Sequence, residues 1–132
     1  MNHYIVMFII MILAGALSTM SVWADKLADV RYSLNDAYMI LLMGGWMIFF
    51  MGLYHKEATP TVIGATIAIA TFFAIRKQLF VTQDQYVQGM IPHHSMAVHM
   101  SRKLLEKGTA YKPFVSNIIS TQEKEINYMK GL

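Results

Sequence analysis

The sequence predicts an all-α protein in which three transmembrane helices precede a two-helix hairpin. Hydrophobic residues make up 55% of the 132 residues. Charged residues make up only 14%, against about 25% in ordinary soluble domains. Three uncharged apolar runs approach the roughly 20 residues that a helix needs to cross a bilayer. We therefore expect a membrane domain over residues 1–80 and a helical-hairpin domain over residues 81–132.

The apolar runs predict membrane spans near residues 4–24, 37–54 and 60–76. The first run has a rival interpretation as a cleaved signal peptide, because Val22 and Ala24 are small residues in the place of a cleavage site. The positively charged lead-in of such a signal is missing. Both interpretations stay open on the sequence alone.

Small residues and a proline refine the picture of the spans. Pro60 follows Thr59 and marks the start of the third span. Small residues four apart predict close contact between helices in lipid. These pairs are Gly15 and Thr19, Gly64 and Ala68, and Ala70 and Ala74.

The distribution of basic residues bears on orientation. With three spans, Lys56 lies on one side of the membrane and four basic residues lie on the side of the C-terminal domain. The positive-inside rule then predicts that this domain is cytoplasmic. The four residues are Lys26, Arg31, Arg76 and Lys77.

Composition excludes several classes of function. The net charge of +3, from 11 Lys/Arg and 8 Asp/Glu, forms no basic stripe, so nucleic acid is not an expected partner. The sequence contains no cysteine, which excludes disulfides, thiolate chemistry and cysteine-based metal sites. The Glu-x-x-His pairs of di-iron bundles, His-Glu-x-x-His, a phosphate loop and nucleophile motifs are also missing. We therefore expect no enzyme, and rank a ferritin-like oxidase below the other hypotheses.

The C-terminal domain carries helix start and stop signals. Thr82 and Gln85 form a capping-box pair, Gly108 is a natural stop, and Pro113 suits the first turn of a second helix. Two helices of this length enclose too little core alone. We expect the hairpin to dimerise into a four-helix bundle or to dock on the membrane domain.

The first predicted helix of the hairpin contains a dense group of methionines and histidines between Met90 and Met100. Helical spacing places Met90, His93, His94 and Ala97 on one face, with Met100 at its edge and His99 pointing away. On the second helix, the matching stripe contains Ile118, Gln122, Glu125 and Met129.

An antiparallel hairpin with its turn near residue 109 sets Glu125 opposite His94 and Met129 opposite Met90. Thioether sulfur prefers copper(I) and its mimic silver(I), and imidazole extends the choice to copper(II). Glu125 or Gln122 would fix the orientation of a ligating histidine. Packing methionines and hydrogen-bonded histidines are the competing interpretation, but two adjacent imidazoles on an apolar stripe cost free energy unless paired or coordinated.

The hairpin also resembles a known family. Residues 86–98 read Tyr-Val-Gln-Gly-Met-Ile-Pro-His-His-Ser-Met-Ala-Val, and residues 118–129 supply an Ile-Ile…Gln…Glu-Ile…Met helix. This pattern resembles the family catalogued as domain of unknown function 305, in a membrane-bound three-span form. The resemblance implies a ferritin-like bundle, association with copper binding and tolerance, and frequent periplasmic location. The ligands it implies are Met90, His93, His94 and Met129, with Gln122 and Glu125 in support.

Longer members of that family carry the helix pair twice, so a single pair here favours a homodimer. The resemblance implies a multi-pass protein of a bacterial inner membrane with an extracytoplasmic C-terminal domain, against the cytoplasmic side that charge counting predicts. The leading hypothesis is a membrane-anchored copper(I)- or silver(I)-binding protein in metal homeostasis that exchanges copper with a donor or acceptor protein. The alternative is a non-catalytic helical assembly module whose His/Met cluster is structural.

The second span offers a weaker pattern. Met39, Met43, Met47 and Met51 recur every four residues, and His55 continues the series. A sulfur ladder for copper(I) and ordinary packing both explain this spacing.

Overall fold

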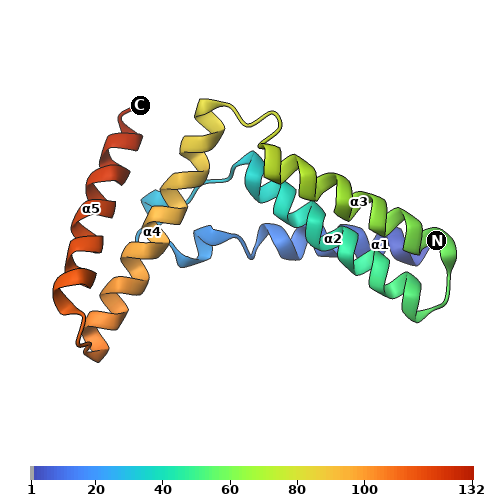
Figure 1. Ribbon diagram of the computed structural model, residues 1–132, viewed down its shortest axis with the longest axis horizontal. Coiled ribbons are helices and arrows are strands. Elements are labelled where there is room, and N and C mark those ends of the chain that lie inside the picture. The colour runs from blue at the N-terminus through green and yellow to red at the C-terminus, as the bar shows by residue number, and fades with distance from the viewer. Residues whose placement is uncertain (1) are drawn as a thin grey trace. The chain divides into compact units, whose positions relative to one another are not determined.

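The computed structural model describes residues 2–132, and within them the chain is all-α, as predicted (Figure 1). The chain divides into two compact units. The first comprises the chain before Met20 together with Leu34–Val81, and the second comprises Met20–Ser33 together with Thr82–Leu132. The helices are α1 Asn2–Ala16, η1 Met20–Trp23, η2 Leu27–Asp29, α2 Leu34–Tyr54, α3 Ala58–Lys77, α4 Gln83–Lys107 and α5 Lys112–Lys130, of which η1 and η2 are short 3-10 helices.

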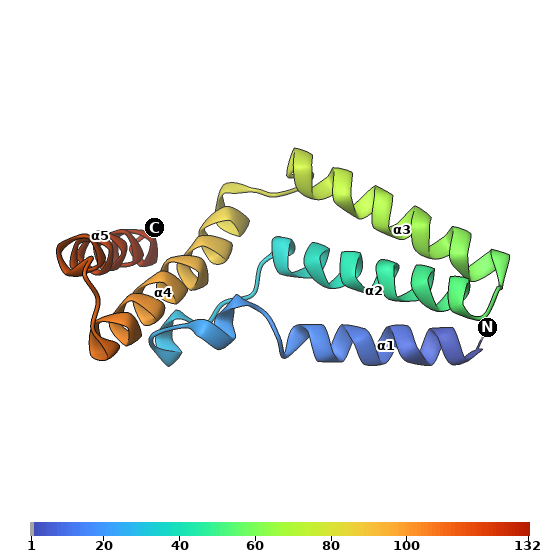
Figure 2. The same cartoon turned by 60° about the horizontal axis from the view of Figure 1, so that its bottom comes forward.

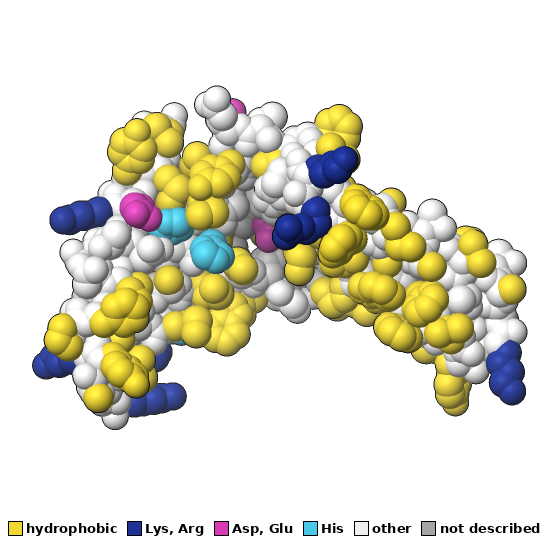
Figure 3. Space-filling view, viewed as in Figure 1, with side chains coloured by type: hydrophobic (Ala, Val, Ile, Leu, Met, Phe, Trp, Pro, Cys, Tyr) yellow, Lys and Arg dark blue, Asp and Glu magenta, His cyan; other side chains and the backbone are white. Residues whose placement is uncertain are grey.

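Three segments within residues 2–132 are long and apolar enough to cross a membrane, as predicted. They are Asn2–Trp23, Leu34–Tyr54 and Ala58–Lys77. All of these residues except Met20–Trp23 belong to the first unit. The regular α1 ends at Ala16, before the end of the first segment. Hydrophobic side chains make up much of the visible surface of the first unit in Figure 3.

Glycines allow α2 and α3 to pack closely. The predicted contact residues Gly64 and Ala68 are buried. A Cβ added to Gly64 would lie 2.3 Å from the backbone nitrogen of Phe49, and one added to Gly45 would lie 2.9 Å from the backbone nitrogen of Ala68. The small-residue pairs predicted from the sequence did not include the glycines of α2. The predicted contact residue Ala70 is exposed.

Gly64→Ala is expected to loosen the pairing of α2 with α3. The added methyl group meets backbone atoms of Phe49 and Gly45, which cannot rotate away. Overpacking of this kind costs about 1–3 kcal/mol. Thermal unfolding in detergent should report a lower midpoint, whereas Gly131→Ala, whose added Cβ would lie 3.5 Å from the Tyr128 carbonyl oxygen, should leave it unchanged.

The second unit contains the predicted helical hairpin. The Thr82 hydroxyl accepts a hydrogen bond from the Gln85 backbone N–H at 3.2 Å and caps α4. The helix stops at Gly108, whose φ of 90° suits glycine, and a proline occupies the first turn of α5. Figure 2 shows the two helices joined by a short turn. Ile91, Val98 and Ile126 form the buried core between them.

A third layer of the second unit comes from residues 20–33, which pack against α4. The fully buried Ser95 hydroxyl accepts a hydrogen bond from the Asp25 backbone N–H at 2.8 Å and donates one to Asp29 at 2.7 Å. The sequence assigned residues 20–33 to the membrane domain. In the structure they join the C-terminal helices, because this polar network holds them there.

Ion pairs tie the same segment to both helices of the hairpin. Lys130 of α5 pairs with Asp29, which is only 3% exposed, and Arg102 of α4 pairs with Asp25 and with Glu123 of α5. Burial alone would raise the pKa of Asp29. Hydrogen bonds from Lys130 and Ser95 outweigh it and hold the pKa below the ordinary value of 3.8.

This lowered pKa predicts loss of stability in acid. A carboxyl with a depressed folded pKa contributes stability that is fully present above its unfolded value of 3.8. That stability is lost as the pH falls below 3.8 and through the lower folded pKa. The unfolding free energy of the second unit, measured across this range, should fall less for Asp29→Asn than for the wild type. Parallel curves would contradict the assignment.

Candidate metal centre

The candidate centre is built around His94 on α4 and Glu125 on α5. His94 is 9% exposed, and its Nε2 lies 2.5 Å from the Glu125 Oε2. The sequence-based register predicted this pairing. The carboxylate remains half-exposed, so the pair lies at the edge of the hairpin interface with access to solvent.

Both ring nitrogens of His94 face hydrogen-bond acceptors. Its Nδ1 lies 2.9 Å from the Met90 backbone carbonyl, one turn earlier on α4. Because a carbonyl oxygen only accepts, Nδ1 carries a proton and donates. An ionised carboxylate also only accepts, so Nε2 donates to Glu125 in this arrangement. A metal ion at Nε2 would have to displace both the Nε2 proton and the carboxylate.

The face of α4 turned toward α5 differs from the predicted one. The buried residues on this face include Ile91, His94 and Val98, whereas His93 is exposed. The predicted stripe through Met90, His93 and Ala97 therefore lies at the flank of the interface. Its position is shifted because α4 also buries Ser95 against residues 20–33, and a helix with two covered faces shows no single apolar stripe.

The other predicted ligands surround His94 to different degrees. The rings of His93 and His94 have centroids 6.1 Å apart. Met129 packs on the hairpin core, and Met90 and Gln122 are half-buried. Glu125 and the Met90 carbonyl engage both ring nitrogens of His94, and the supporting role of Gln122 stays a prediction.

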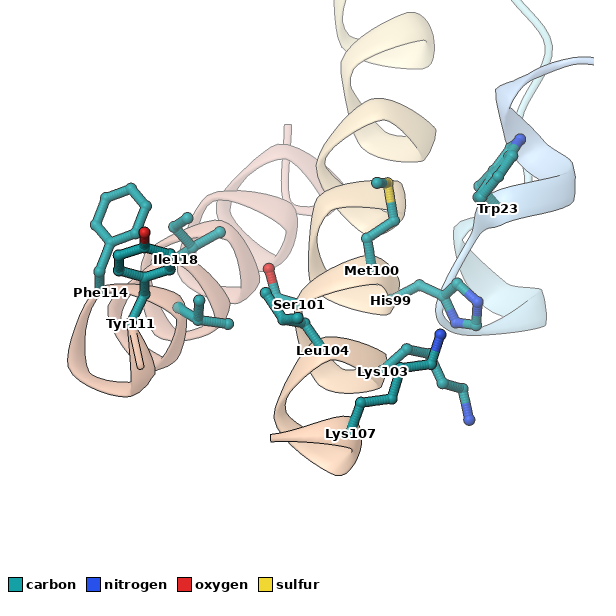
Figure 4. Close-up of a pocket in the computed structure, with 11 residues that line it drawn as sticks. Trp23, His99, Met100, Ser101, Lys103, Leu104, Lys107, Tyr111, Phe114 and Ile118 are labelled. Atoms are coloured by element: carbon teal, nitrogen blue, oxygen red, sulfur yellow. The ribbon is translucent and has the colours of Figure 1, made fainter. Parts of the chain in front are cut away.

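Met100 lies elsewhere on the hairpin. It is exposed and lines an apolar groove of about 710 Å³ near the turn. Figure 4 shows the groove crossing α4, with Trp23 of η1 on one side and Phe114 of α5 on the other. His99 also lines this groove. Met100 is therefore separated from the His94–Glu125 pair.

The side chains around His94 determine which metal ion could bind there. Within residues 2–132, no three His, Cys, Asp or Glu side chains are grouped closely enough to hold one. His94 and Glu125 supply one nitrogen and one carboxylate, and the remaining donors nearby are the exposed imidazole of His93 and the thioethers of Met90 and Met129. A complete shell here would depend on sulfur, which fits a soft monovalent ion.

Comparison with known proteins places the chain in a family. Residues 74–132 match the family described as Domain of unknown function (DUF305). The chain is also 42% identical over 141 residues to "Uncharacterized protein L153" of Acanthamoeba polyphaga mimivirus, across 100% of this chain and 93% of that protein. The chain belongs to the same family as this viral protein and carries a DUF305 domain. No solved structure matches it.

The DUF305 match confirms the resemblance drawn from the Met-Ile-Pro-His-His pattern. It begins within α3 and covers α4 and α5. Residues 20–33 lie outside it, although Asp25 and Asp29 bind Ser95 inside it. Sequence reasoning missed this contact, since the only available signal was an unexplained cluster of aspartates after the first span.

Proposed function

We propose that the protein is a membrane-anchored copper(I)- and silver(I)-binding protein in metal homeostasis or tolerance. The observation that carries the proposal is the His94 ring, whose Nδ1–H donates to the Met90 carbonyl, so that Nε2 is the nitrogen that would ligate once its proton and Glu125 are displaced. Metal-binding histidines ordinarily donate their second N–H to such an acceptor, because this fixes the ring and raises its basicity.

The ligands in this proposal are His94 and His93, with the thioethers of Met90 and Met129. When the ion binds, Nε2 loses its proton to solvent and Glu125 leaves Nε2. The carboxylate remains beside the site, where its charge offsets that of a monovalent cation. Copper(II) is a weaker candidate, because thioether donors favour the softer copper(I). Met100, in the groove, takes no part in this set.

A second candidate function rests on the same pair of residues. Both ring nitrogens of His94 are already engaged by protein acceptors, and this arrangement also suits a structural hydrogen bond that locks α4 to α5. The DUF305 hairpin would then be an assembly module without metal. Copper(I) titration of the full chain in detergent against a competing chelator separates the two, since only the first predicts tight binding. The full chain is needed because residues 81–132 alone lack the layer formed by residues 20–33.

Met129→Ala is expected to weaken copper(I) more than zinc. Thioether sulfur discriminates between these ions, whereas the imidazoles serve both. Parallel competition titrations with copper(I) and zinc should show the selective loss, with Met100→Ala as a matched control that changes neither affinity. An equal loss for both metals would assign Met129 to packing alone.

The family resemblance also bears on the partners and the location of the protein. The protein exchanges copper with a donor or acceptor protein and performs no catalysis. We place the C-terminal unit on the extracytoplasmic side of a bacterial inner membrane, as the family resemblance implies. Dimerisation into a ferritin-like four-helix bundle stays a prediction, and residues 20–33 now supply part of the cover that the hairpin was expected to take from a second chain.

A further inference from the structure

Two contacts define how α1 and α2 pair in the first unit. A Cβ added to Gly44 would lie 2.5 Å from the Phe8 ring, and one added to Gly15 would lie 2.9 Å from the Ile40 side chain. Residue numbers rise along α1 as they fall along α2, so the helices are antiparallel, as Figure 2 also shows. The interface therefore runs from Gly15 toward the N-terminal end of α1.

Two histidines lie in contact at that end of the interface. The rings of His3 and His55 have centroids 6.1 Å apart and stand nearly perpendicular, at 78°. His3 belongs to the first turn of α1, and His55 directly follows α2. Imidazole is a ligand for copper in both oxidation states.

Two methionines follow His3 along α1. Met7 and Met11 follow His3 at steps of four residues, which places all three on neighbouring turns of one helix face. Both methionines are half-buried and lie between Tyr4 and Gly15, the two buried residues of α1. They therefore flank the contact with α2.

The facing part of α2 carries two more methionines. Met47 and Met51 fall between Gly44, which contacts α1, and His55 at intervals of three and four residues. Both are half-buried. His3 contacts His55, and the two helices are antiparallel. Met7, four residues after His3, is therefore expected opposite Met51, four residues before His55.

The other methionines of α2 behave differently. Met39 is 56% exposed and Met43 is 44% exposed. The four-residue series noted in the sequence is therefore split, and only its half next to His55 turns toward α1.

We propose that the first unit holds a second soft-metal site between α1 and α2, with His3, His55, Met7 and Met51 as donors for copper(I) or silver(I). Uncharged thioether and imidazole donors suit a soft monovalent ion in an apolar surrounding. The site lies at the end of the unit opposite its three connections to the second unit. It shares its metal with the proposed function but none of its residues, so either can fail alone.

The test uses the full chain in detergent with His93 and His94 replaced by alanine. Silver(I), which needs no reductant, and anaerobic copper(I) are titrated against a competing chelator. We expect about one equivalent to remain bound. Met7→Leu with Met51→Leu, a swap that conserves volume, should then weaken binding by at least about ten-fold. The matched control is Met39→Leu with Met43→Leu, which should retain full affinity.

His3→Ala with His55→Ala gives an independent test, because both residues are exposed and their removal leaves the helix contact intact. A comparable loss of affinity is expected. Loss of all binding in the His93/His94 background, or wild-type affinity after the Met7 and Met51 changes, would overturn the proposal. Equal weakening by the Met39 and Met43 control would assign binding to methionine content and overturn it as well.

Discussion

Replacement of His93 and His94 together by alanine is expected to abolish tight copper(I) binding at the C-terminal unit. Loss of supporting groups alone costs metal sites about 10–100-fold, and this change removes both nitrogen ligands. Of the two single variants, His94→Ala should have the larger effect. Its ring is held by the Met90 carbonyl, whereas the exposed His93 must first be ordered.

The measurement is chelator competition with the full chain, counting equivalents as well as affinity, since a second site would contribute its own. His99→Ala is the control, because His99 lines the apolar groove near the turn and lies apart from Glu125. Circular dichroism should confirm that the double variant folds. We expect it to fold because the Glu125 carboxylate, which is half-exposed, can be hydrated once the His94 ring is removed. Unchanged binding by the double variant would leave the structural role of the His94–Glu125 pair in place.

The hairpin could be predicted in detail because residues at the helix ends themselves determine where each helix begins and stops. Thr82, Gly108 and Pro113 act on their own backbone neighbourhood, and each performs the expected role. Once the turn is fixed, the antiparallel register follows, and it places Glu125 beside His94. Apolar run length likewise predicts the three spans without knowledge of their contacts.

The exact buried face of α4 could not be predicted in the same way. It depends on contacts with residues 20–33, which lie more than 60 positions earlier in the sequence, as the Ser95 bonds show. A serine at position 95 carries no signal that distinguishes a buried double partner from a solvated surface residue. The glycines of α2 were missed as contacts with α3 because glycine has a low helix propensity, and the sequence alone does not show when it permits close packing of two helices instead.

Asp29→Ala is expected to destabilise the second unit by about 2–3 kcal/mol. Breaking a buried ion pair from one side costs about 3–5 kcal/mol, and the partial exposure of Lys130 reduces this because its ammonium group can turn to water. The Ser95 hydroxyl, fully buried, also loses the acceptor of its hydrogen bond. Trp23 fluorescence in a Trp46→Phe background would follow unfolding of this unit specifically. Glu106→Ala is the matched control, since its pair with Lys103 is exposed on both sides and should contribute little. If Asp29→Ala and Glu106→Ala had equal effects, residues 20–33 would not form part of the folded C-terminal unit.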